Sequence, residues 1–81
     1  MKRISDRETL NITGANIKKA RLAAKMSQQT LSNKLETRAV YICRGSVARL
    51  EVGARIVSDI ELKEIADILG ITISKLFENV E

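Results

Sequence analysis

The most informative stretch of the sequence is RGSVARLEVG, residues 44–53. Val47 and Leu50 are three residues apart and Glu51 follows directly, which is the spacing of one helix face. The pattern predicts a helix over about residues 44–52 that buries both apolar side chains and part of Glu51. Gly53 then stands where a helix commonly ends in a left-handed residue.

Two further helices are predicted on the N-terminal side of this stretch. The first runs from Ala15 to Lys25, with Thr13 or Gly14 as its cap and one stripe made by Ile17, Ala20, Arg21 and Ala24. Ser27 is a good N-cap for the second helix. Leu31 and Leu35 then form its inward face.

The least regular part of the chain lies between these helices and residue 44. The second helix is expected to fray within residues 36–42. Val40 and Ile42 are expected to enter the core, with Tyr41 between them in the turn.

The C-terminal third predicts two more helices. Ser58-Asp59-Ile60-Glu61 fits a capping box, in which the serine and the glutamate satisfy each other's backbone N–H groups. Gly70 closes this helix, and Thr72 caps a last short one. The apolar face of the longer helix consists of Leu62, Ile65, Ala66 and Leu69. We therefore expect an all-α domain of five short helices over residues 14–81, preceded by an arm or flexible segment at 1–13.

The charge is unevenly distributed along the chain. Residues 1–55 hold twelve Lys and Arg against four Asp and Glu, a net charge of +8, and residues 56–81 hold a net charge of −4. A basic front and an acidic back indicate one face for a polyanion and another for a different contact, although a solvated surface with random asymmetry explains the charges equally well.

The composition argues against several classes of protein. The chain has no histidine, one cysteine and no glycine-rich phosphate loop, and its carboxylates are not paired at an acid–base spacing, so an enzyme, a metal site and a cofactor are not expected. No apolar run approaches the length of a membrane span, and the start lacks the apolar stretch of a signal peptide. A single cysteine excludes an internal disulfide and favours the cytoplasm.

Five landmarks follow one another in a characteristic order. Ser27-Gln28 begins a helix, and VARLEVG at 47–53 follows. A capped helix then ends in ILGI at 68–71, and SKLF at 74–77 is the last landmark. This order resembles the phage-repressor/Cro family of helix-turn-helix regulators over residues 14–78. The segment between Leu35 and Val47 is about five residues longer than in the shortest members, as in a long-turn variety of the family.

The resemblance implies a lambda-repressor-like fold and a role for each of several residues. The start of the third helix, Arg44-Gly45-Ser46, is expected to enter the major groove of DNA, with Arg44 the first choice for base reading and Arg49 the second. The phosphate contacts implied are Gln28, Gln29, Arg38 and Arg55. Arg21 and Glu51 are implied to form a structural ion pair that holds the first helix against the third.

Three residues near the third helix leave alternatives open. Gly45 either permits close approach to a base or backbone, or shows that this protein reads less sequence than its relatives. Cys43 is either a redox switch or, as we favour, a small residue at the helix cap that acts as a buried, inert filler. Tyr41 either stacks on DNA or, as we favour, covers the core from the turn.

The expected function is that of a sequence-specific regulator of transcription, a repressor by resemblance, with double-stranded DNA as its partner and no small-molecule ligand. Most relatives bind as two-fold dimers, and the candidates for that contact here are Leu76, Phe77, Val80 and the acidic C-terminal surface. An antitoxin-like or adaptor module, which uses this fold mainly to bind another protein, is the alternative.

Overall fold

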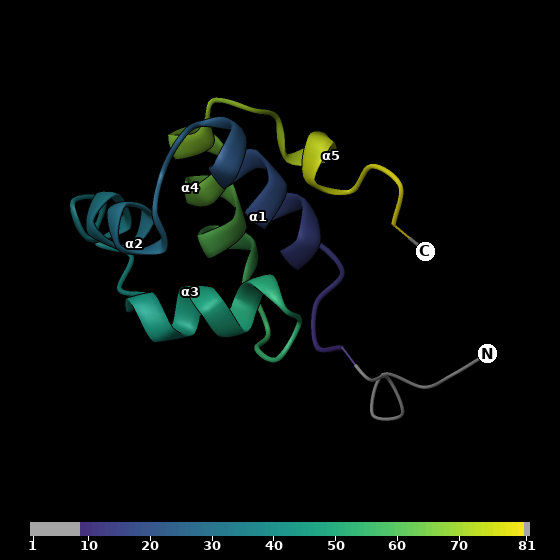
Figure 1. Ribbon diagram of the computed structural model, residues 1–81, viewed down its shortest axis with the longest axis horizontal. Helices are drawn as coiled ribbons and strands as arrows, with labels where there is room; N and C mark the ends of the chain where they lie inside the picture. Colours follow the sequence, from purple (N-terminus) through teal and green to yellow (C-terminus); the bar gives the residue numbers. More distant parts are fainter. Residues whose placement is uncertain (1–8, 81) are drawn as a thin grey trace.

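The computed structural model describes residues 9–80, and these residues form five helices (Figure 1). In chain order the helices are α1 (Gly14–Ala23), α2 (Gln28–Glu36), α3 (Arg44–Glu51), α4 (Asp59–Leu69) and α5 (Ile73–Leu76). The described part of the chain is all-α with five short helices, as the sequence predicted. None of the helices in the described part of the chain is long and apolar enough to cross a membrane.

Local hydrogen bonds begin three of the helices as expected. The Ser27 hydroxyl accepts a hydrogen bond from the backbone N–H of Thr30, and Thr72 does the same for α5. Ser58 and Glu61 form the complete capping box at the start of α4. Each cap supplies a partner for an N–H group that the helix itself leaves unpaired.

The cap of α1 differs from the prediction. Thr13 occupies the N-cap position, but its side chain caps nothing, and its hydroxyl is buried without a partner in the described structure. The Asn11 side chain accepts hydrogen bonds from the backbone N–H groups of Thr13 and Gly14 at 3.1 and 2.7 Å instead. The start of α1 is thus capped from a residue that we had assigned to the arm.

The first four helices all end in the same motif. Each is followed within three residues by a residue with a positive φ, and the N–H of the residue after that one donates to a carbonyl five residues earlier, as in a Schellman motif. The positive-φ positions are Lys25, Ala39, Gly53 and Gly70. This geometry explains why α1 ends at Ala23, two residues before the predicted boundary.

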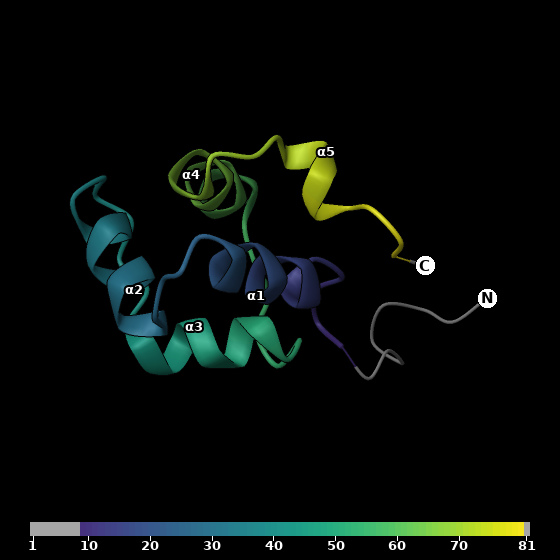
Figure 2. The same cartoon turned by 45° about the horizontal axis from the view of Figure 1, so that its top comes forward.

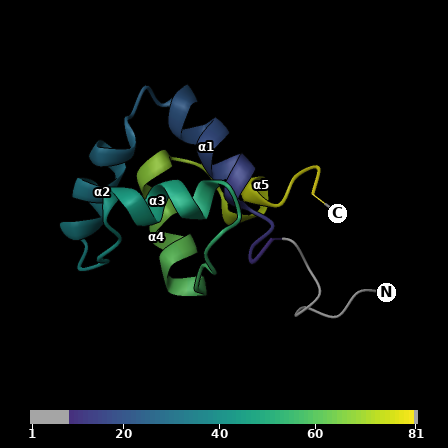
Figure 3. The same cartoon turned by 60° about the horizontal axis from the view of Figure 1, so that its bottom comes forward.

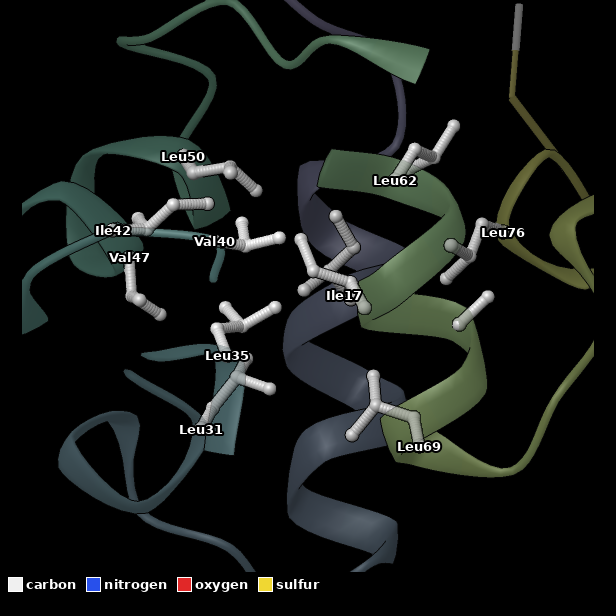
Figure 4. Packing of buried hydrophobic residues seen from close by; sticks show 12 residues of the cluster. Ile17, Leu31, Leu35, Val40, Ile42, Val47, Leu50, Leu62, Leu69 and Leu76 are labelled. Atoms are coloured by element: carbon white, nitrogen blue, oxygen red, sulfur yellow. The ribbon is translucent and has the colours of Figure 1, made fainter. Parts of the chain in front are cut away.

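One cluster of twelve aliphatic side chains forms the core, and all five helices contribute to it. Figure 4 shows Ile17 of α1 at its centre, with side chains from α2, the following turn and α3 on one side and those from α4 and α5 on the other. Val40 and Ile42 are buried, as predicted. Tyr41 is 77% exposed, so the prediction that it covers the core is wrong: two consecutive residues of an extended turn point in opposite directions.

The packing leaves α3 at the edge of the domain. It contacts α1 and α2, while α4 and α5 lie on the far side of α1 (Figure 2). One side of α3 is therefore in the core and the other faces outward along most of its length (Figure 3).

Candidate nucleic-acid interface

The two sides of α3 carry different chemistry. Val47, Leu50 and Glu51 are buried, whereas Arg44 and Arg49 are exposed and Gly45 and Ser46 are half-buried. Arg44 and Arg49, the two arginines expected to read bases, therefore both project from the domain surface.

Glu51 is the centre of a buried polar junction. The Arg21 Nε and Nη2 atoms donate to its two carboxylate oxygens at 2.6 and 3.1 Å, and both residues are 5% exposed. Arg21 Nη1 also donates to the carbonyl of Met26 at 2.7 Å. Gln28 Nε2 donates to Glu51 at 3.0 Å. Three elements, α1, α2 and α3, are thus held together by one carboxylate, and both of its oxygens accept charge-assisted hydrogen bonds.

The hydrogen bond of Gln28 bears on its expected phosphate contact. Its side-chain amide donates to the buried carboxylate of Glu51, so a phosphate contact by this amide would require that hydrogen bond to be shared or broken. Gln29 is exposed, and its amide donates to Asn33 one turn later at 2.9 Å. Of the two glutamines, Gln29 has the side chain at the surface.

Arg38 and Arg55, the other two expected phosphate contacts, are already paired with carboxylates of α4. Arg38 Nη1 donates to Glu64 at 2.9 Å and lies 3.8 Å from Asp67. Arg55 forms a two-pronged pair with Glu61 at 3.0 and 3.1 Å. These pairs anchor the connections before and after α3 to α4.

The ion pair with Arg55 also changes the pKa of Glu61. The side-chain hydrogen bonds from Arg55 hold the pKa of Glu61 below its ordinary value, and the Ser58 backbone N–H acts in the same direction. Glu61 in turn raises the pKa of Arg55. Glu61 therefore serves both the capping box of α4 and the connection that follows α3.

A cluster of polar side chains lies on the outward side of α3. Arg49 Nη2 donates to the Ser46 hydroxyl at 2.8 Å, and the Cys43 thiol lies 3.4 Å from the same oxygen. Cys43 is at the N-cap position as expected, but it is exposed, so the prediction of a buried filler is wrong. Its hydrogen bond to Ser46 lowers the pKa of the Cys43 thiol.

Sequence reasoning missed two residues that position α3. Asn11 donates to the carbonyls of Leu50 and Arg55 at 3.0 and 2.8 Å, while its oxygen caps α1. Gly14 lies so close to α3 that a Cβ there would collide with the Leu50 carbonyl oxygen. A turn-forming Asn before a helix was the only signal in the sequence, and it did not reveal the partner.

Comparison with known families decides the class of this protein. The helix-turn-helix family model of the Cro and repressor type matches residues 17–76, which span α2, α3, α4, α5 and most of α1. The chain belongs to this family. It is a DNA-binding helix-turn-helix regulator. No curated protein sequence and no solved structure matches the chain.

Proposed function

We propose that this helix-turn-helix protein is a sequence-specific repressor of transcription that places α3 in the major groove of double-stranded DNA. The observation that carries the proposal is the division of α3 into a fully packed side and an outward side with two exposed arginines, Arg44 and Arg49. A helix fits the major groove, and an arginine fork pairs with the O6 and N7 atoms of guanine.

Phosphate binding is proposed for the start of α2. The backbone N–H groups of Gln28 and Gln29 lie at a helix N-terminus, where the helix dipole favours an anion, and Gln29 adds an exposed amide. Arg38 and Arg55 can join them only by leaving or sharing their carboxylate partners on α4. Their contribution is therefore smaller than that of two unpaired arginines.

A homodimer is proposed on a narrower surface than the sequence indicated. Leu76 is completely buried in the core and cannot contact a second protomer, so the expectation that it forms part of the dimer contact is wrong. Phe77 is 41% exposed and Val80 is half-buried, and both remain in the proposed contact with the acidic residues around them. The reason for the correction is that the short α5 turns its one leucine inward to close the domain.

Of the two regulatory outcomes, repression needs fewer features of the protein than activation. A bound domain blocks a promoter simply by occupying it, whereas activation needs a second surface that recruits the transcription machinery. The family resemblance points in the same direction. A promoter–reporter assay with the selected site placed over the promoter tests this choice: reduced expression is expected, and raised expression would contradict repression.

The test of DNA binding is a titration of the protein with its selected duplex and with a scrambled duplex over a range of salt concentrations. We expect a steep fall of affinity with salt for both duplexes and a large preference for the selected one. Arg44→Ala should reduce the salt slope by about 1. Lys75→Ala removes the same charge from α5, which lies on the side of the domain away from α3 in Figure 2, and should change the slope little.

Weak, sequence-blind binding by the wild-type protein would contradict this function. It would favour the protein-interaction module, for which a partner would then have to be sought.

A further inference from the structure

The side chain of Arg49 lies back along α3 and does not extend straight into solvent. Its Nη2 atom donates to the Ser46 hydroxyl one turn earlier at 2.8 Å. A Cβ placed on Gly45 would meet Arg49 Nη1 at 3.6 Å. The guanidinium group therefore rests over the first turn of the helix, across the backbone of Gly45.

Gly45 lies next to this guanidinium. A Cβ at this position would touch Arg49 Nη1 only at ordinary van der Waals distance, and no other non-neighbouring atom of the described residues, outside the backbone of α3 itself, lies within 4 Å of it. The glycine therefore leaves the helix surface beside the Arg49 guanidinium open.

The Ser46 hydroxyl fixes one corner of the guanidinium. An arginine has five N–H donors, and the bond to Ser46 uses one of them, which leaves the remaining donors for a ligand. Arg44 differs, because within the described residues it makes no side-chain hydrogen bond or ion pair with any other residue. An arginine already held in place loses less conformational freedom on binding than one that must be ordered by the ligand.

We propose that Arg49, positioned by Ser46 across Gly45, is the main base-reading residue and recognises a guanine at one position of each half-site. Arg44 contributes charge near the phosphates and little sequence preference. This assignment reverses the order expected from the sequence, and it rests on the proposed function, since it needs α3 to face the major groove.

The test is a selection of bound duplexes from a random pool with the wild-type protein, followed by affinity measurements on the selected duplex with each guanine changed to adenine in turn. The variants are Arg49→Ala, Arg49→Lys and Arg44→Ala. We expect the wild type to discriminate at one guanine by about tenfold or more. Arg49→Ala and Arg49→Lys should both lose that preference, because lysine keeps the charge but not the planar fork. Arg44→Ala should weaken all duplexes alike.

Ser46 is a positioning residue in this scheme, and its variants separate that role from a general loss of structure. Ser46→Ala should reduce the guanine preference about threefold while the unfolding midpoint stays close to that of the wild type. Ser46→Thr keeps the hydroxyl and should restore the preference.

The outcomes distinguish the two levels of the proposal. A wild-type motif whose guanine preference survives in Arg49→Ala, or disappears only in Arg44→Ala, overturns the role of Arg49 and leaves the regulator intact. A wild-type selection without any enriched motif overturns the proposed function and this inference together.

Discussion

The buried and exposed sides of α3 use the same residue type for opposite purposes. On the buried side, the Arg21 guanidinium is enclosed by Glu51 and the Met26 carbonyl, and all its partners belong to the protein. On the exposed side, Arg49 has one protein partner, Ser46, and Arg44 has none among the described residues. The difference teaches that an arginine's role follows from how completely the fold satisfies its donors, and the residue type alone does not reveal it.

The largest effect is expected when the buried side is broken. Arg21→Ala leaves the Glu51 carboxylate buried with only Gln28 as a side-chain partner, which should lower the free energy of unfolding by about 3–5 kcal/mol. Urea denaturation measures the change. Lys18→Ala, at an exposed position of the same helix, is the matched control. A fully stable Arg21→Ala protein that no longer binds DNA would show that Arg21 belongs to the interface.

Substitutions on the exposed side of α3 should weaken DNA binding and leave the stability of the fold nearly unchanged. The double variant Arg44→Ala/Arg49→Ala should change the free energy of unfolding by no more than about 0.5 kcal/mol, because both side chains are exposed. Its affinity for the selected duplex should fall by at least about 2 kcal/mol, through lost base and phosphate contacts. Parallel denaturation and binding titrations give the two numbers. Equal losses in the free energies of unfolding and of DNA binding would contradict the assignment of separate roles to the two sides of α3.

A smaller effect is expected for the ion pair between Arg55, in the connection after α3, and Glu61 of α4. The folded pKa of Glu61 is lowered from 4.5, so its stabilisation is fully present above that pH and is lost as the pH falls through the lower, folded value. Glu61→Gln should cost about 1 kcal/mol at neutral pH, since it removes the ion pair and weakens the capping box.

The pH dependence of unfolding tests more directly whether the ionised form of Glu61 is the source of this stabilisation. The difference in unfolding free energy between wild type and Glu61→Gln should shrink below pH 4.5. Glu36→Gln, whose side chain is exposed on α2, serves as the comparison. A difference that stays constant down to the lowest pH at which the protein folds would exclude the ionised Glu61 as its source.

The smallest effect concerns the turns on either side of α3. Ala39 before the helix and Gly53 after it hold the same left-handed position, with φ values of 61° and 79°. Ala39→Gly should raise the free energy of unfolding by about 0.5–1 kcal/mol, because glycine adopts this conformation without the steric cost of a Cβ. Thermal unfolding measures the gain. Glu36→Gly, at a helical position of α2, should instead be destabilising.

Much of the fold could be predicted because its signals are local. Ser27, Ser58 and Thr72 cap their helices through groups three residues away, and Gly53 and Gly70 end theirs within the same turn. Such contacts depend only on sequence spacing. The errors arose where a side chain had a choice of direction, as for Tyr41 and Cys43, both of which lie outside regular helix and are exposed.

The sequence by itself determined the helices, their buried sides and most of their ends, with α1 as the exception, since a helix repeats every 3.6 residues and its caps are close in the chain. Only the tertiary structure decided which outward groups are still available to DNA. Asn11 meets Leu50 across 39 residues, Gly14 admits the Leu50 carbonyl, and Arg38 finds Glu64 across 26 residues. These contacts form between residues that the chain separates widely, and no local spacing encodes them because they exist only once the helices have packed.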